Sequence, residues 1–286
     1  MTGRLFIFGV GYCGLQIARL ARAAGWTVAG TCTSADRAAS LRADGIEAHP
    51  FDGSASLPAD TLATATHVLS TIAPGTSGDP VLRTSRNLLR RARWLGYLST
   101  TGVYGDHHGD WVYETTPPRP SQPRSIERLA TERAWQVLGL EVGANVDIFR
   151  LPGIYGPGRS AIDQVKAGTA RRIDKTGQVF SRIHVEDVAG TVLMALSQPH
   201  AGGVFNVADD LPASTADVVA YACGLLGKPT PPLVPWAEAE AGMSEMARSF
   251  WAESRRVRNE RIKNDLGVIL RYPTYREGLS AIAAAG

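Results

Sequence analysis

Arg-Leu-Phe-Ile-Phe-Gly-Val-Gly-Tyr-Cys-Gly, residues 4–14, is the stretch from which the fold can be predicted. Its apolar run over residues 5–8 is suited to a strand that is buried on both faces. Apolar residues then recur at helical spacing over residues 15–21, which predicts an amphipathic helix. The three glycines between these segments, spaced G-x-G-x-x-G, therefore lie in a strand-to-helix turn.

Each glycine of this turn has a physical role in binding a dinucleotide. Gly9 permits the tight turn, Gly11 leaves room for a pyrophosphate beside the backbone, and Gly14 lets the helix pack closely on the strand. The helix N-terminus, from Tyr12 and Cys13 onward, offers free N–H groups and a positive dipole end to a phosphate. The turn predicts a dinucleotide site, and the alternative is a tight strand-to-helix turn that binds no ligand.

The residues after the second predicted strand, 26–31, indicate which dinucleotide is bound. An enzyme that selects NAD usually places an acidic residue there, which binds the ribose hydroxyls and repels a 2′-phosphate. Here Thr33 and Ser34 follow the strand, and Arg37 lies three positions further on. Hydroxyl groups and an arginine suit a phosphate, so we predict NADP, with NAD as the alternative. Ser34 also suits the N-cap of a helix over residues 35–43.

Strand and helix signals continue to alternate along the chain. Strands are predicted over residues 46–51, 67–72 and 94–99, with a crossover helix over residues 80–93. This order predicts an α/β fold, a Rossmann-type doubly wound parallel sheet, whose ligands bind beyond the carboxyl ends of the strands. We expect Asp52 to contact the adenine amino group, and Thr71 and Ala73 to lie beside the pyrophosphate and the nicotinamide ribose.

The composition excludes several classes of protein. The chain of 286 residues has a net charge of only +3 and no long basic run, so we expect no nucleic-acid partner. The arginines at 90, 91, 93, 255, 256 and 258 are interpreted as solvated helix faces. Three cysteines without metal-ligand spacing predict free thiols and no metal site. No apolar run could span a membrane and the first strand begins at once, so we expect a cytoplasmic protein.

Four later motifs resemble the extended short-chain dehydrogenase/reductases, the NAD-dependent epimerase/dehydratase group. Residues 98–105, Leu-Ser-Thr-Thr-Gly-Val-Tyr-Gly, are similar to that family's Ser-Ser-x-x-Val-Tyr-Gly stretch. Residues 150–158, 183–189 and 204–208 resemble its sixth-strand loop, its I-H-V-x-D-x-A element and its last strand. The resemblance implies a cofactor domain over residues 1–157, to which 183–210 return. A smaller substrate lobe would comprise residues 158–182 and 211–286.

The family's catalytic residues are only partly present. The resemblance implies a Ser or Thr, and then Tyr-x-x-x-Lys on a helix, where the tyrosine exchanges a proton during hydride transfer and the lysine lowers its pKa and holds the ribose. Thr100 occupies the Ser/Thr position, but Arg124 and Arg128 stand where the tyrosine and lysine are expected. An arginine does not exchange protons near neutral pH. Arg128 can still bind the ribose, and Arg124 can bind an acidic substrate. Tyr104 and Tyr155 are the nearest alternative proton donors.

The same motifs supply further candidates for the pocket. Pro152 is expected beside the cofactor, and Tyr155 and Arg182 are expected to contact a small-molecule substrate. His184 is expected to tie the substrate lobe to the sheet by hydrogen bonds, while Asp187 lies in the first turn of a helix.

Two functions remain open at this point. The first is an NADP(H)-binding oxidoreductase or epimerase that acts on a small hydroxyl- or carbonyl-bearing metabolite without the usual Tyr/Lys pair. The second is a non-catalytic NADP(H)-binding sensor or regulatory module.

The C-terminal part offers helices but no motif with decodable chemistry. We predict a helix over residues 216–226, capped by Ser214 or Thr215, a proline-rich loop over 227–235 and a basic helix over 255–266. The family resemblance implies a homodimer through residues 80–93 and 124–139, although a monomer would show the same amphipathic pattern.

Overall fold

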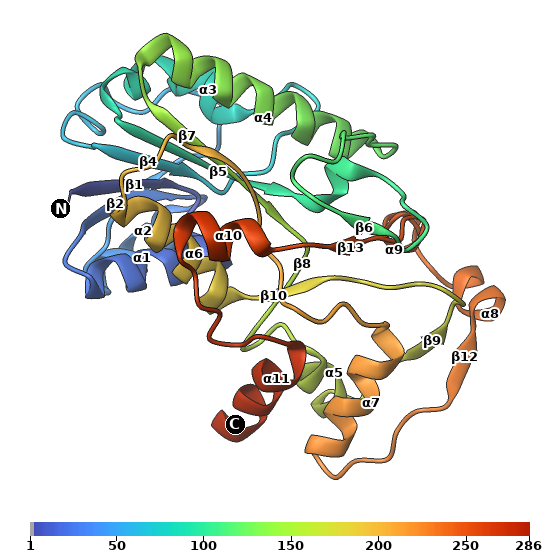
Figure 1. Cartoon of the computed structure of the whole chain (residues 1–286). Helices are drawn as coiled ribbons and strands as arrows, with labels where there is room; N and C mark the ends of the chain where they lie inside the picture. Colours follow the sequence, from blue (N-terminus) through green and yellow to red (C-terminus); the bar gives the residue numbers. More distant parts are fainter. Residues whose placement is uncertain (1–2) are drawn as a thin grey trace.

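The centre of the molecule is a seven-stranded parallel sheet (Figure 1). It is seen in a computed structural model that describes residues 3–286. The strand order is β11-β7-β5-β4-β1-β2-β3. The strands are β1 (Arg4–Phe8), β2 (Thr27–Cys32), β3 (Glu47–Pro50), β4 (His67–Ser70), β5 (Trp94–Thr100), β7 (Asn145–Leu151) and β11 (Gly203–Asn206). The order reverses between β1 and β4, which confirms the predicted doubly wound Rossmann-type sheet.

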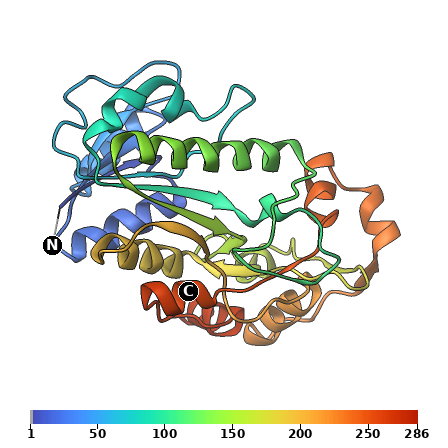
Figure 2. The ribbon, with the colours of Figure 1, turned by 45° about the horizontal axis from the view of Figure 1, so that its top comes forward.

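Helices cover both faces of the sheet (Figures 1 and 2). One face carries α1 (Tyr12–Ala23), α2 (Ala35–Ala43), α6 (Val185–Ser197) and α10 (Glu260–Leu266), and the other carries α3 (Pro80–Ser85) and α4 (Pro123–Val142). Side chains of β1 alternate between two separate cores: Leu5 and Ile7 pack under α1, whereas Phe6 and Phe8 pack on the other side. Burial on both faces explains why β1 reads as an uninterrupted apolar run.

The predicted crossover helix over residues 80–93 is wrong in part. The α-helix α3 ends at Ser85, and a 3-10 helix, η1 (Arg86–Arg91), continues toward β5. The Thr84 hydroxyl donates a hydrogen bond to the carbonyl of Pro80 at 2.8 Å, one turn back. Such bonding of Ser and Thr side chains to the backbone competes with helix geometry, and the amphipathic spacing does not report it.

A smaller lobe extends beyond the carboxyl ends of the strands (Figure 1). Its helices α5 (Ala161–Lys166), α7 (Thr215–Leu225) and α11 (Tyr275–Ala285) share one apolar core. One short parallel pair, β8 (Gly153–Tyr155) with β10 (Arg182–His184), connects it to the rest, and a second pair, β9 (Arg172–Asp174) with β12 (Leu233–Pro235), lies within the lobe. Ser214 caps α7, as one of the two predicted alternatives has it. The segment predicted as a loop over residues 227–235 contains the short strand β12.

The predicted basic helix over residues 255–266 is also wrong in its first half. Arg256 and Val257 form β13 (Arg256–Val257), which pairs with β6 (Trp111–Val112), and the helix α10 begins only at Glu260. The Arg258 guanidinium lies 3.8 Å from the centre of the Trp111 ring. These contacts come from a segment more than 140 residues earlier in the chain, so the local basic pattern cannot indicate them.

Two kinds of feature are absent from residues 3–286. None of their helices combines the length and apolar character needed to cross a membrane. Within the same residues, no three or more His, Cys, Asp or Glu side chains are grouped so that they could hold a metal ion.

Candidate functional site

The glycine turn between β1 and α1 is fixed by two threonine hydroxyls. Gly9 has φ +91°, a conformation that favours glycine, and its N–H donates to the Oγ1 of Thr31 at 2.9 Å. Thr71 donates from its hydroxyl to the Gly9 carbonyl at 2.6 Å. A Cβ atom on Gly14 would lie 2.3 Å from that carbonyl oxygen, so only glycine allows α1 this close to the turn. Thr71 therefore positions the turn through its hydroxyl.

The space in front of this turn fits an anion. A Cβ atom on Gly11 would meet nothing within 4 Å, so the middle glycine faces open space. Among residues 3–286 no side chain caps the N-terminus of α1, and the first turn of α1 holds no acidic residue, which leaves N–H groups and the positive dipole end free. Burial raises the pKa of the Cys13 thiol to about 11, so it adds no negative charge at neutral pH. Tyr12 donates from its hydroxyl to the carbonyl of Pro157 at 3.2 Å, beside this space.

The end of β2 presents hydroxyl groups and a cation. Thr33 and Ser34 are exposed, and Ser34 is the N-cap of α2, accepting from the N–H of Arg37 at 3.2 Å. No carboxylate among the described residues lies within 4 Å of the Arg37 guanidinium. After β3, the Asp52 carboxylate accepts two hydrogen bonds from Ser54, which lower its pKa. Asp52 therefore stays ionised and can accept a hydrogen bond.

A cavity of about 260 Å³ lies at the carboxyl ends of β4 and β5. Its wall brings together four predicted residues from separate segments: Ala73, Thr100, Arg124 and Arg128. Arg128 donates to the carbonyl of Leu98 at 2.7 Å, and to the Tyr97 hydroxyl, so its guanidinium is held at the end of β5. The Thr100 hydroxyl oxygen accepts from the N–H of Gly102 at 3.1 Å, which leaves its proton free to donate.

Arg124 is held differently from Arg128. Its guanidinium lies over the ring of Phe250, 4.0 Å from the ring centre. Phe250 comes from α9 (Glu245–Trp251), a helix that none of the sequence motifs singled out. Arg124 is thus an exposed cation stacked on an aromatic ring.

Tyr104, predicted as a catalytic residue, is placed where a substrate cannot contact it. Its side chain is completely buried, and its hydroxyl donates to the Oδ1 of Asn206 at 2.8 Å. Burial raises the pKa of its hydroxyl. Tyr104 is a core residue, and its position in the Val-Tyr-Gly loop serves packing between β5 and β11.

A buried ion pair behind Thr100 escaped the sequence analysis. Arg150 on β7 donates to both carboxylate oxygens of Glu132 on α4, at 2.7 and 3.1 Å, and Ser99 donates to the same carboxylate at 2.6 Å. The two charged side chains are only 5% and 3% exposed. A charge buried this deeply requires its partner, and the pair fixes the end of β5 and therefore Thr100. The sequence signal that could have indicated this pair is Glu132 itself, a glutamate within the predicted amphipathic helix.

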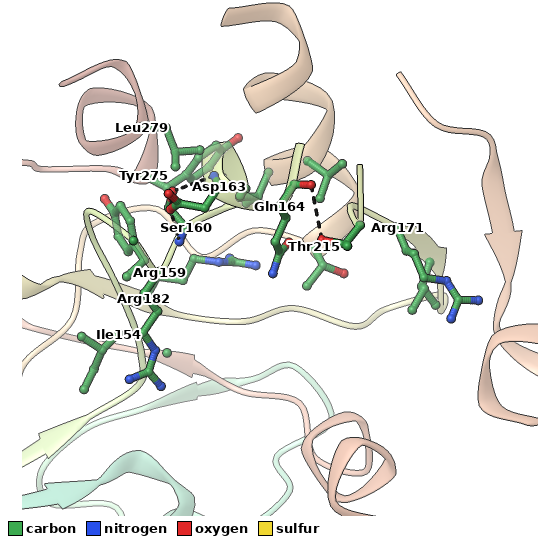
Figure 3. A pocket seen from close by; sticks show the side chains of 18 of the residues that line it. Ile154, Arg159, Ser160, Asp163, Gln164, Arg171, Arg182, Thr215, Tyr275 and Leu279 are labelled. Atoms are coloured by element: carbon green, nitrogen blue, oxygen red, sulfur yellow. Dashed lines mark hydrogen bonds between the residues drawn. The ribbon is translucent and has the colours of Figure 1, made fainter. Parts of the chain in front are cut away.

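Two larger cavities continue from Thr100 into the smaller lobe. One, of about 370 Å³, is lined by Thr100, Pro152 and Arg182, and shares Arg159 and Arg182 with another of about 620 Å³. Figure 3 shows the larger cavity, with the Arg159 side chain extending across its middle and Arg171 at its far end. Tyr155 forms part of its apolar wall. Because adjoining cavities share walls, the three form one cleft between the sheet and the smaller lobe.

Arg182 and Tyr155 lie in this cleft with much of their surface covered. Arg182 donates to the carbonyls of Phe180 and Ala213, both at 2.8 Å, and burial lowers its pKa. The Tyr155 hydroxyl is 3.4 Å from the carbonyl of Thr274, and burial raises its pKa. A tyrosine with a raised pKa is a poor proton donor near neutral pH, so the geometry favours Tyr155 as a wall of the pocket.

His184 and Asp187 connect the sheet to the C-terminal segment. The His184 ring lies between Tyr155 and Tyr272, with ring centres at 5.2 and 4.1 Å, and its Nε2 has no hydrogen-bond partner within the described chain. Asp187 instead accepts from the N–H groups of Arg271 and Tyr272, at 2.6 and 3.1 Å. The expected hydrogen-bonded tie thus comes from Asp187, and His184 contributes packing.

Three residues of the cleft were missed because they lie far along the chain. Phe250, Glu253 and Arg255 line the cavities around Thr100. Arg255 donates to the carbonyl of Gly105 and to the Glu253 carboxylate, both at 2.7 Å, and is not the solvated helix residue that was predicted. Glu253 also accepts from Ser121 at 2.9 Å. No spacing in the sequence indicates these contacts.

Known proteins resemble the chain in sequence and in structure. The model of the NAD dependent epimerase/dehydratase family matches residues 62–208. Protein YeeZ of Escherichia coli K12 is 30% identical over 233 residues, which cover 76% of this chain and 81% of that protein. A 3-diazoavenalumate denitrifying reductase of Streptomyces sp is 29% identical over 140 residues, 46% of this chain and 45% of the reductase.

Among solved structures, a functionally unknown conserved protein from Silicibacter pomeroyi DSS superimposes with a TM-score of 0.90. It is 44% identical, and the match covers 99% of both chains. The motifs, the sheet order and these similarities agree, and the chain belongs to the NAD-dependent epimerase/dehydratase family.

Proposed function

We propose that the protein is an NADP(H)-dependent oxidoreductase or epimerase that acts on a small metabolite bearing a hydroxyl or carbonyl group. The observation that carries this proposal is the cavity that joins Thr100 and Arg128, at the carboxyl end of β5, to the larger cavities of the smaller lobe. The reductase relative from Streptomyces supports oxidoreductase chemistry. The proposed cofactor domain comprises residues 1–157 and 183–210, and the substrate lobe comprises residues 158–182 and 211–286.

The turn between β1 and α1 would hold the pyrophosphate through the N–H groups after Gly11. Thr33, Ser34 and Arg37 favour NADP over NAD, because hydroxyl groups and a guanidinium can bind a 2′-phosphate. None of these three positions carries a carboxylate, which would repel the phosphate. Asp52 would accept from the adenine amino group. When bound, NADP(H) supplies or accepts the hydride.

At the reaction centre the chain provides hydrogen bonds and positive charge. Thr100 donates to the reacting oxygen of the substrate. Arg128, fixed by Leu98 and Tyr97, orients the nicotinamide ribose and keeps a cation beside it. Tyr155 and Arg182 line the substrate's path, together with Arg124 at its inner end.

A non-catalytic sensor of NADP(H) is the second candidate. One observation favours it: no tyrosine or lysine of the described chain lines either cavity that contains Thr100, so the family's proton-transfer pair has no direct replacement there. The two functions differ in whether bound cofactor changes its redox state.

A second copy of this chain is the proposed partner. Ile126, Val137 and Leu140 on α4 share one face and are 49%, 50% and 86% exposed. Light scattering would give a dimer mass, and charged substitutions at Val137 and Leu140 would reduce it to the monomer mass.

We place the protein in the cytoplasm.

The deciding experiment is a parallel titration of the purified protein with NADPH and NADH, followed by nicotinamide fluorescence and tryptophan quenching. We expect tight binding of NADPH and weak binding of NADH. Failure of both to bind would contradict the enzyme and the sensor alike. Oxidation of bound NADPH by a carbonyl compound would then identify an enzyme, and Thr100→Ala should slow that oxidation about 10- to 100-fold. Unchanged turnover would exclude the role of Thr100.

A further inference from the structure

The walls of the cleft carry a strong excess of positive charge. Six arginines line the three cavities, at positions 124, 128, 159, 171, 182 and 255, and the acidic residues on the same walls are Asp163 and Glu253. The excess of four positive charges is larger than the net charge of the whole chain, +3. The charge is therefore concentrated where a substrate would bind.

Few of these arginines are neutralised by the protein itself. Asp163 forms the capping box of α5 with Ser160. Glu253 forms an ion pair with Arg255 and accepts a hydrogen bond from Ser121. Across residues 3–286, no carboxylate lies within 4 Å of the other five arginines. Asp209 is the acidic neighbour of Arg182, but burial raises its pKa to about 8, which leaves it mostly protonated at pH 7. The cleft lacks counter-charges that an anionic ligand would supply.

The excess extends to the inner end of the cleft, where the reaction would occur. Three guanidinium groups, those of Arg124, Arg128 and Arg255, line the 260 Å³ cavity that contains Thr100. Arg128 is held by the end of β5, and Arg255 by Gly105 and Glu253. Arg124 is different, because its guanidinium stacks on the face of the Phe250 ring, which leaves the N–H groups at the edge of the guanidinium free to donate.

We propose that Arg124 binds a carboxylate attached to the reacting carbon, so that the substrate is a 2-oxo acid or a 2-hydroxy acid. The inference rests on the proposed function, and it names the substrate class for the same site. A planar fork of N–H donors matches the two oxygens of a carboxylate, and stacking on Phe250 fixes the plane of that fork. The adjacent carbonyl or hydroxyl oxygen then lies within the cavity that contains Thr100. The arginine replaces proton exchange at this position with recognition of an anion.

Oxamate tests this inference, because it has a carboxylate next to a carbonyl that resists reduction. Isothermal titration with oxamate, with and without saturating NADPH, is compared for the wild type, Arg124→Ala, Arg124→Lys and Arg133→Ala. Arg133 is an exposed residue on the same helix and does not line the cleft, so its variant matches the change in charge. Acetamide and inorganic phosphate serve as the neutral and the phosphate probes.

We expect the wild type and Arg133→Ala to bind oxamate equally and Arg124→Ala to bind it about 10- to 100-fold more weakly. Arg124→Lys should fall between them, since it keeps the charge and loses the fork. Unaltered NADPH binding by Arg124→Ala would show that the variant is folded.

Three results would overturn the inference: no binding of oxamate by the wild type, equal losses in Arg124→Ala and Arg133→Ala, or tighter binding of phosphate than of oxamate. If NADPH does not bind the wild type, the proposed function fails, while the titration without cofactor still tests the carboxylate site.

Discussion

The glycine turn over residues 9–14 and the reaction centre over residues 100–128 meet at the same edge of the sheet, yet they relate differently to the family pattern. In the turn, every glycine has the surroundings that its position in the pattern requires. In the proposed reaction centre, the strand end and the helix are in place, and the proposed assignment puts Arg124 and Arg128 at the positions of the tyrosine and the lysine. A family motif thus predicts the course of the backbone more reliably than the chemistry of the side chains on it.

The largest expected effect concerns the buried Glu132–Arg150 ion pair behind Thr100 and its contribution to stability. Glu132→Gln would leave the Arg150 guanidinium buried without its counter-charge, which should lower the free energy of unfolding by about 3–5 kcal/mol. Denaturant unfolding followed by tryptophan fluorescence measures this loss. The double variant Glu132→Leu/Arg150→Met, which removes both charges, should be more stable than the single variant. A Glu132→Gln protein as stable as the wild type would contradict the buried pair.

The glycine turn can be tested with two substitutions of the same size. Gly14→Ala places a Cβ atom against the backbone carbonyl of Gly9, so we expect a loss of about 3 kcal/mol in unfolding free energy. Gly11→Ala meets no atom in the free protein and should cost less than about 1 kcal/mol. Gly11→Ala should nevertheless weaken NADPH binding at least about 10-fold, because its methyl group would occupy the pyrophosphate's space. Equal stability losses in the two variants would disprove the distinction between packing and binding glycines.

Arg37→Ala tests whether the outer end of the proposed cofactor site selects NADP over NAD. Removing one guanidinium from a phosphate should weaken NADPH binding about 10- to 100-fold, equivalent to roughly 1.4–2.7 kcal/mol. NADH has no 2′-phosphate, so its affinity should change less than about twofold. Fluorescence titrations with both cofactors give the ratio. Parallel losses for NADPH and NADH would mean that Arg37 acts on the turn and not on the phosphate.

The smallest effect concerns the packing role of His184 between Tyr155 and Tyr272. Burial lowers the pKa of His184 to about 4, below the ordinary value of 6.5, so the unfolded chain binds more protons than the folded protein between these values. Stability from this residue is therefore present above pH 6.5 and is lost as the pH falls toward 4, by about 1 kcal/mol between pH 7 and pH 5.5. Unfolding curves of the wild type and His184→Gln should differ in this dependence on pH. An identical dependence would contradict the buried neutral ring.

Much of the fold and part of the site could be predicted from residues close together in the chain. The strands β1, β4 and β5 and the helices α1 and α2 lie within a few residues of their predicted positions, because periodicity and caps are local signals. The catalytic role predicted for Tyr104 is not supported, because its hydroxyl donates to Asn206, more than 100 residues later, and the Val-Tyr-Gly motif gives no indication of that contact. The helix predicted from residue 255 failed for the same reason, since its first residues pair with β6.

The sequence by itself determined the strand-to-helix turn and the order of the family motifs, and it placed Arg124 and Arg128 on the helix that follows β5. The turn and each single motif depend on residue identity, backbone freedom and short-range spacing, and the order of the motifs can be read directly along the chain. The tertiary structure alone decided that Phe250, Glu253 and Arg255 close the cavity around Thr100, and that Arg124 stacks on a ring from α9. Such contacts join segments more than 120 residues apart, and they form only when packing of the smaller lobe on the sheet brings those segments together.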